Sequence, residues 1–238
     1  MDQNRREFFP YIDGLRAVSI LAVVLFHLDS RLLPGGFVGV DVFFTVSGFV
    51  VASSLHNVRA DSFRALAAFF YARRFRRIAP ALLAMLAVTS LVAALFTPYA
   101  YLSSFTFNVG VAAFLGYSNI VLARGVDYFS PLGEFTPFTH TWSLAVEEQF
   151  YLVFPFIFFF LLKKRRMSAS AVGVLALLCA ASFAYGLLEH RLPIDLGFYS
   201  SLARFWEIGA GVLVYALMAR TGLFETGGRG ELAWATWT

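Results

Sequence analysis

The sequence predicts an all-α membrane protein: a polytopic transmembrane helical bundle with about six visible spans and one re-entrant or interfacial segment. Apolar residues make up 59% of the 238 residues and charged residues 14%, whereas soluble domains average about 45–50% and about 25%. Aromatic residues reach 18%, which suits lipid-facing helices and interfacial belts. The one cysteine, Cys179, excludes an internal disulfide.

Six apolar segments are predicted to cross the membrane, and together they form one membrane domain over residues 1–219. These spans cover residues 11–28, 37–55, 79–96, 144–162, 172–188 and 205–219. Pro80 falls in the first turn of the third span, where proline is tolerated, and glycines in the second span allow close helix packing. Residues 220–238 are Gly-rich and are expected to form a poorly structured tail, which suggests a C-terminally truncated chain.

Two clusters of basic residues decide the predicted topology. One is a loop over residues 56–78 that holds six arginines, and the other is residues 163–166, directly after the fourth span. The positive-inside rule places both clusters, and the N-terminus, in the cytoplasm. Three apolar segments separate the clusters, so one of them does not cross. Residues 106–122, which Asn and Gly interrupt, are expected to be re-entrant; the alternative is that one cluster violates the rule.

Three ionisable residues share one face of the first span. Arg16 and His27 are eleven residues apart, close to a whole number of helical turns, and Asp13 lies one turn before Arg16. A single ionisable group in a bilayer core costs about 2.5–3.5 kcal/mol, so three on one face favour an interior polar pathway. The alternative is that Asp13 and Arg16 are interfacial and His27 caps the far end.

A second polar group, residues 139–151, opens the fourth span with the sequence THTWSLAVEEQFY. Ser143 can cap this helix, and the helix dipole favours a carboxylate in the first turn. Glu147 and Glu148 point about 100° apart on a helix, so one of them can face the interior. The re-entrant topology starts this helix on the side where the first span ends, so His27 and a carboxylate can meet at one depth. That is the minimum for general-base chemistry with the carboxylate orienting the imidazole.

Arginines supply two further candidate groups. Arg74 and Arg77 lie one turn apart on a helix and can bind one anion together, and phosphate is the anion that paired guanidinium groups bind best. The alternative is that the two arginines only determine the topology. Arg204 and Glu207 open the last span, where an ordinary interfacial anchor would look similar. The sequence shows no metal-ligand cluster, glycine-rich phosphate loop or serine-nucleophile motif.

Five stretches resemble, in order, the motifs of the acyltransferase family three of integral membrane proteins: YIDGLRAVSILAVVLFH, GGFVGVDVFFTVSGF, RRFRRIAP, THTWSLAVEEQFYL and RFWEIGAG. The resemblance covers Tyr11 to about Met218. That family O-acylates sugars of the cell envelope, including lipopolysaccharide O-antigen and peptidoglycan. The resemblance implies that His27 is the catalytic base and that Glu147, a better match than Glu148, is the motif carboxylate.

The resemblance also implies the substrates and the residues that bind them. Arg16, Arg74 and Arg77 are implied in donor binding or acyl transit. The full set of residues implied in substrate binding is Asp13, Arg16, Asp41, Ser47, Arg74, Arg77, His140, Trp142, Arg204 and Glu207. The donor is acetyl-CoA or another acyl-CoA on the cytoplasmic side, and the acceptor is a glycan or lipid-linked sugar on the outer side. No bound cofactor or metal is expected.

The expected function is therefore O-acyl transfer by a multi-pass protein of the inner or plasma membrane, with its N-terminus in the cytoplasm. The bilayer, the acyl-CoA and the sugar are the expected partners, and nucleic acid is not. Two alternatives stay open. One is a transporter or flippase that uses the polar face of Asp13, Arg16 and His27, and the other is an inactive, truncated remnant.

Overall fold

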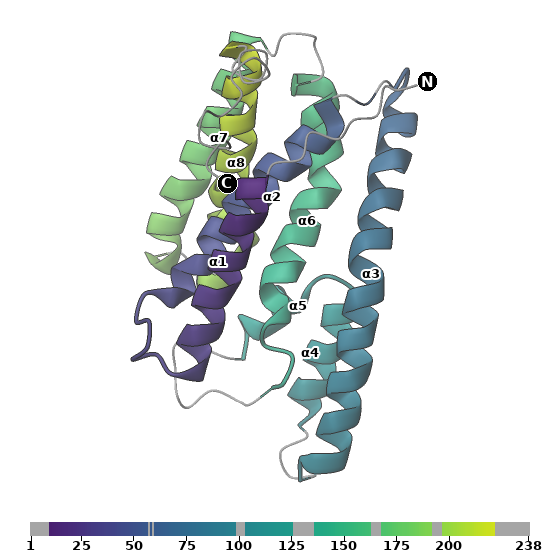
Figure 1. The fold of residues 1–238 in the computed structure, drawn as a ribbon, viewed down its shortest axis with the longest axis vertical. Helices are drawn as coiled ribbons and strands as arrows, with labels where there is room; N and C mark the ends of the chain where they lie inside the picture. Colours follow the sequence, from purple (N-terminus) through teal and green to yellow (C-terminus); the bar gives the residue numbers. More distant parts are fainter. Residues whose placement is uncertain are drawn as a thin grey trace, which may run out of the picture.

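The computed structural model describes residues 10–56, 58, 60–98, 103–125, 136–162, 168–191 and 197–221, which form helices and no β-strand (Figure 1). The long helices are α1 Pro10–Leu28, α2 Gly39–His56, α3 Phe63–Phe96, α6 Thr141–Ile157, α7 Ala169–Leu188 and α8 Ser201–Thr221. Short turns η1 Gly36–Val38 and η3 Phe158–Leu162 extend α2 and α6, and η4 Glu189–Arg191 and η5 Gly197–Tyr199 lie between α7 and α8. Six helices are long and apolar enough to cross a membrane, which confirms the predicted bundle.

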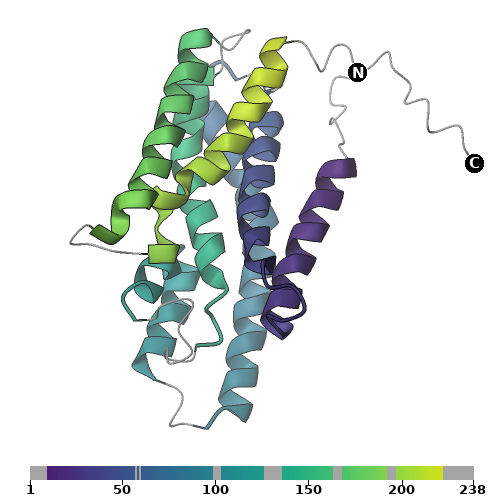
Figure 2. The same ribbon diagram turned by 90° about the vertical axis from the view of Figure 1, so that its left-hand side faces the viewer.

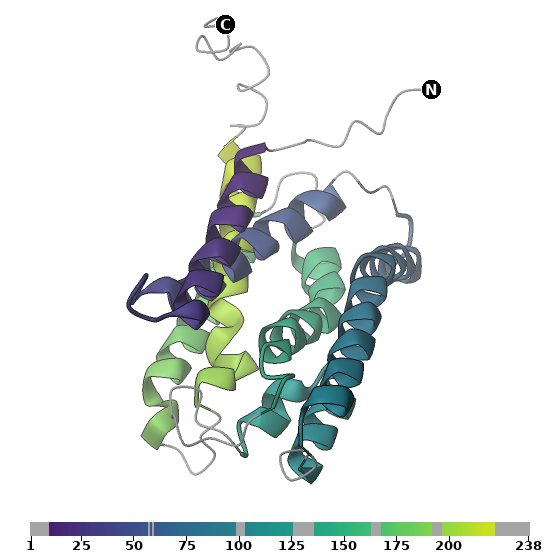
Figure 3. The ribbon, with the colours of Figure 1, turned by 60° about the horizontal axis from the view of Figure 1, so that its bottom comes forward.

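The long helices run up and down, with α6 between two groups (Figures 1 and 3). On one side α2 packs against α1 and α8, and α8 packs against α7; on the other, α3 meets α6 and the short helix α4 Ser104–Phe114. Figure 2 shows α1 at the edge of the bundle, beside α2. We call the end where α1 ends and α2, α6 and α8 begin the lower end, as Figure 1 draws it, and the opposite end the upper end.

Glycines bring the backbones of neighbouring helices into contact, as predicted for the second span. A Cβ atom at Gly48 of α2 would overlap the carbonyl oxygen of Ile208 in α8, and one at Gly211 of α8 would overlap the carbonyl oxygen of Thr45 in α2. At the other side of α2, a Cβ atom at Gly39 would overlap the backbone of α1. Small residues at such crossings let membrane helices pack tightly, so α2 meets both α1 and α8 at backbone distance.

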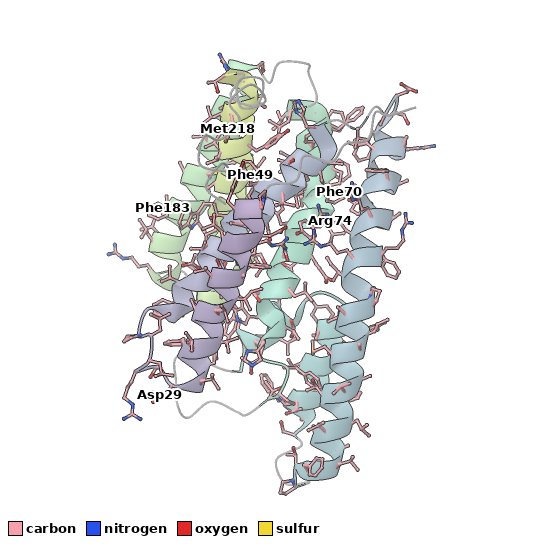
Figure 4. All side chains as sticks on the ribbon, in the orientation of Figure 1. Asp29, Phe49, Phe70, Arg74, Phe183 and Met218 are labelled. Atoms are coloured by element: carbon pink, nitrogen blue, oxygen red, sulfur yellow. The ribbon has the colours of Figure 1, made fainter. Side chains whose placement is uncertain are left out.

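The basic segment predicted as a loop over residues 56–78 is instead helical from Phe63 onward, and this prediction is wrong. Leu66, Phe70 and Arg74 follow one another at four-residue spacing and are buried, which is the pattern of one helical face. Figure 4 shows Phe70 and Arg74 on the side of α3 that faces α6. The charge of this segment alone indicates a loop, but the four-residue spacing of its buried side chains indicates a helix.

Pro80 lies well inside α3, so its predicted place in the first turn of a span is also wrong. Ser62 caps the N-terminus of α3, where its hydroxyl accepts a hydrogen bond from the N–H of Ala65, and the helix runs for 34 residues. A proline inside a helix removes one backbone hydrogen bond. Membrane helices tolerate this because neighbouring groups satisfy the freed carbonyl.

The apolar segment 106–122 is broken into two short helices, α4 and α5 Ser118–Leu122. Gly116 between them has φ +75°, a conformation that favours glycine. With 11 and 5 residues, both are shorter than the ~20 residues that a crossing helix needs. In Figure 1, α3 starts and α6 ends at the upper end. The helices α3 and α6 therefore account for one crossing in each direction, and α4 and α5 between them add none. The second basic cluster, 163–166, and the tail from residue 222 lie outside the described residues.

This path can be tested by the sidedness of single cysteines in a Cys179→Ala background. Cysteines at Pro98, after α3, and at Thr139, before α6, should react with a membrane-impermeant maleimide from the same side, because the segment between them does not cross. A cysteine at Asp61, before α3, serves as the control and should react only from the opposite side. Labelling of Pro98 and Thr139 from opposite sides would show that α4 and α5 cross.

Candidate functional site

Two histidines meet at the lower end of the bundle. His27 lies in the last turn of α1, and His140 lies directly before α6. Their ring centroids are 5.2 Å apart and the ring planes make an angle of 82°. Both side chains are exposed. The structure thus joins the predicted base to a residue that the sequence placed 113 positions away among the substrate-binding candidates.

A backbone carbonyl orients the imidazole of His27. Its Nδ1 lies 2.8 Å from the carbonyl oxygen of Val23. Because a carbonyl only accepts, Nδ1 carries the proton, and Nε2 is the basic nitrogen of the neutral ring. The sequence predicted that Glu147 would do this, but Glu147 accepts a 2.5 Å hydrogen bond from the Tyr151 hydroxyl. Glu147 lies two turns beyond His140 on α6, so the carbonyl of Val23 holds Nδ1 instead.

The ring of His140 is kept neutral by its surroundings. Partial desolvation lowers the pKa of His140, because it disfavours the charged imidazolium, and the nearby His27 lowers it further. Both effects therefore favour the neutral ring of His140 over its charged form. A neutral imidazole can accept a proton from a neighbour or from a bound hydroxyl.

Arg204, at the start of α8, lies between two carboxylates from different helices. Its Nη1 donates hydrogen bonds to Asp41 Oδ1 and to Glu207 Oε1, each at 2.6 Å, and its Nε donates to the carbonyl of Phe198 at 3.2 Å. Glu207 is only 3% exposed, and its Oε2 has no hydrogen-bond partner among the described residues. The cluster therefore ties α2 to α8 and leaves an acidic oxygen in the interior.

Aromatic rings cover the Arg204 guanidinium. Its central carbon lies 4.1 Å from the ring centroid of Phe198 and 5.7 Å from that of Trp142, which are cation–π distances. Trp142 follows His140 by two residues, so this cluster shares the lower end with the histidine pair. Four predicted site residues come together here: Asp41, Trp142, Arg204 and Glu207. Beside them lies a cavity of about 340 Å³ whose polar lining is Arg204, Glu207 and Glu189.

Arg74 forms a second site, between α3 and α6. It is 8% exposed, and its guanidinium lies 5.1 Å from the ring centroid of Tyr151 and 5.5 Å from that of Phe70. Its Nη2 donates to the Ser54 hydroxyl at 3.3 Å, and its Nε has no hydrogen-bond partner within the described part of the chain. A buried cation with spare donors is suited to bind an anion.

A cavity of about 530 Å³ opens at Arg74 between α3, α4 and α6. Glu148, Gln149 and Tyr151 add polar groups to its wall, and the rest of the wall is mostly apolar. Glu147 is buried away from it, so the two acids do face different directions, as predicted. Arg77 is exposed and is not among the residues that line the cavity. A shared anion for Arg74 and Arg77 stays a prediction.

Besides Arg77, three predicted site residues join neither group. The guanidinium of Arg16 lies 5.1 Å from the ring centroid of Phe43 in α2, Asp13 is exposed, and Ser47 is buried in α2. The face predicted on the first span is therefore spread along α1, which contributes one buried residue. Over the described ranges, no three His, Cys, Asp or Glu side chains gather as metal ligands would.

Sequence reasoning missed a polar network that connects α5, α6 and α8. The amide of Gln149 donates to Asn119 Oδ1 at 2.8 Å and to the Gly116 carbonyl at 3.0 Å, and the Ser201 hydroxyl donates to Gln149 Oε1 at 2.6 Å. Asn119 in turn donates to Ser201 Oγ at 2.9 Å and to the carbonyl of Tyr199 at 3.0 Å. The signal was Asn119 itself, a polar residue within an apolar run. The network holds the broken segment against the main bundle.

Comparisons with known proteins show which family and which proteins this chain is similar to. A family model described as an acyltransferase domain matches residues 9–237. O-acetyltransferase OatA of Staphylococcus aureus strain NCTC 8325 is 35% identical over 158 residues, which is 66% of this chain and 26% of that protein. A second protein, from S. aureus strain COL, has a name that suggests an O-acetyltransferase and is 36% identical over 165 residues, 68% of this chain and 27% of its own length.

The chain spans about a quarter of the length of the curated relatives that it matches. No solved structure matches it significantly.

The Arg204 cluster can be tested by stability. Arg204→Gln leaves the buried Glu207 without its cation, and breaking a buried pair in this way costs about 3–5 kcal/mol. The midpoint of thermal unfolding of the detergent-solubilised protein should fall markedly. Arg31→Gln removes an arginine from the exposed Arg31–Asp29 pair, whose side chains are 90% and 38% exposed, and should leave the midpoint unchanged. Equal midpoints for the two variants would contradict the structural role of Arg204.

Proposed function

The chain belongs to the acyltransferase family whose domain model covers residues 9–237, and on that premise we propose that it is a membrane O-acetyltransferase. It transfers an acetyl or other short acyl group from acyl-CoA to a hydroxyl of an envelope glycan or lipid-linked sugar. The names of the relatives support transfer to oxygen. In this scheme the bundle lies in the inner or plasma membrane, with its N-terminus and upper end toward the cytoplasm and its lower end outward.

The observation that carries the proposal is the separation of two chemically distinct sites along one helix. His140, directly before α6, belongs to the histidine pair, and Tyr151 of α6, eleven residues later, lines the Arg74 cavity. At ~1.5 Å per residue the two sites are roughly 16 Å apart along the axis. A donor anchored on one side and an acceptor held on the other suit this arrangement, because the long arm of coenzyme A can carry the thioester between them.

Arg74 supplies the donor site in this proposal. Its guanidinium is buried, partly unpaired and open to a cavity with apolar walls. The unpaired N–H groups of Arg74 would donate charge-assisted hydrogen bonds to the phosphates of acyl-CoA. The apolar walls of the cavity would contact the less polar arm of coenzyme A. Arg77, one turn further on α3, stays the predicted second contact to the phosphates.

His27 supplies the base. Its Nδ1 is held by the Val23 carbonyl, so Nε2 can take the proton of an acceptor hydroxyl. The hydroxyl oxygen then attacks the thioester carbonyl, and the thiol is released. The neighbouring Arg204 cluster contains two carboxylates, and the more exposed one, Asp41, would accept a hydrogen bond from a sugar hydroxyl. Arg16 lies between the two ends, on the predicted acyl path.

The donor site is tested by Arg74→Lys. Lysine keeps the charge but loses the planar fork that binds phosphate, so acetyl-CoA should bind more weakly by tenfold or more, while membrane insertion is unchanged. The measurement is acetyl-CoA binding to the purified protein by isothermal titration calorimetry. Arg64→Lys, at an exposed position near the start of α3, is the matched control. Unchanged affinity in Arg74→Lys would leave this arginine with a structural role only.

The base is tested by His27→Gln, because an amide keeps hydrogen bonds but is not basic. Loss of a general base lowers the rate by ~10²–10⁴. The variant should therefore be expressed at the wild-type level but transfer almost no acetyl groups to glycan. Glu147→Gln should also lower transfer strongly, since it removes the carboxylate beside Tyr151 and Arg74, and Glu148→Gln should lower it much less. Robust transfer by His27→Gln would place the base elsewhere, and equal losses for the two glutamates would remove the preference for Glu147.

A further inference from the structure

Each turnover of the proposed reaction leaves a proton on His27. Its Nδ1 is engaged by the Val23 carbonyl, so the proton arrives at Nε2 and must also leave from Nε2. A base that keeps its proton cannot act again. A second base within reach of Nε2 would take this proton and so speed the return of His27 to its neutral form.

His140 is placed for that task. Its ring centroid is 5.2 Å from that of His27, a separation at which ring nitrogens come within hydrogen-bond reach directly or through one water. It comes from a different element, the turn before α6, whose hydrogen bonds fix the backbone: the Thr141 hydroxyl donates to the Phe138 carbonyl at 2.7 Å, and the Thr139 hydroxyl donates to the Thr136 carbonyl at 2.9 Å. The side chain is exposed, so it can exchange protons with water.

The electrostatics of the pair favour one proton, not two. Desolvation and the nearby His27 both lower the pKa of His140, which favours a neutral ring with a nitrogen that can accept a proton. A second positive charge at this distance would be repelled. Because the pKa of His140 is lowered, a proton that reaches this ring is readily released to water.

We infer that His140 is a proton relay for His27. This inference rests on the proposed function. The acceptor hydroxyl gives its proton to Nε2 of His27, the ester O–C bond forms, and the C–S bond of the thioester breaks with its electron pair on the thiolate. The thiolate takes up a proton from water on its own side. His27 then gives its proton to His140, which releases it to water, and both rings end neutral.

Chemical rescue tests the relay. In membranes that contain the full chain, transfer from acetyl-CoA to soluble peptidoglycan fragments should fall by tenfold or more in His140→Ala, and added imidazole should restore a large, saturable part of the rate. Pyrazole, a ring of the same size with far weaker basicity, should restore none. Ser143→Ala is the matched control: its hydroxyl contacts the His140 carbonyl, and the variant should keep the wild-type rate without responding to imidazole.

The outcomes separate this inference from the function on which it rests. Absence of transfer by the wild-type protein would overturn the proposed function and the relay with it. Wild-type transfer together with a fully active His140→Ala would overturn the relay alone. So would equal rescue by imidazole and pyrazole, because that would show that His140 only fills space. Rescue by imidazole alone supports the relay.

Discussion

The backbone contact between α2 and α8 is the constraint on which the lower end of the bundle depends. Gly48 and Gly211 each face a carbonyl of the opposite helix and leave no room for a side chain. This close approach lets Nη1 of Arg204 reach Asp41 at 2.6 Å across the two helices. On the other side of α2, Gly39 lets the backbone of α1 pack closely against α2. This contact places His27, at the end of α1, beside His140 at the start of α6. Three glycine contacts therefore assemble side chains from four helices at one end.

Much of the architecture could be predicted because hydropathy and helix direction are local properties. The six spans follow from apolar length, and the broken segment between α3 and α6 follows from the charge conflict and the polar interruptions of residues 106–122. The chemistry at the site was also visible in part: His27, Arg74 and Arg204 stand out because an ionisable residue in an apolar stretch is expensive. Their residue types alone single them out as candidates.

Their partners could not be predicted, since pairing is a property of the folded bundle. Arg204 and Asp41 are 163 positions apart, and nothing local couples them. Glu147 was paired with His27 on depth alone, whereas the Tyr151 hydroxyl one turn further along α6 takes its carboxylate. The charge of the arginines in α3 indicates a loop, and only the four-residue spacing of Leu66, Phe70 and Arg74 indicates a buried helical face. Gln149 follows the two glutamates in the same stretch, and no local pattern shows that its side chain joins α5, α6 and α8.

The central claim, that the α2–α8 contact assembles the lower end, can be measured as a distance. Spin labels at Val42 of α2 and Leu202 of α8, both exposed, report the separation of these helices near Asp41 and Arg204. In Gly211→Val the new side chain overlaps the Thr45 carbonyl, so pulsed electron paramagnetic resonance should show a longer and broader distance distribution than in the wild-type protein. A distribution identical to wild type in correctly inserted Gly211→Val protein would contradict the claim.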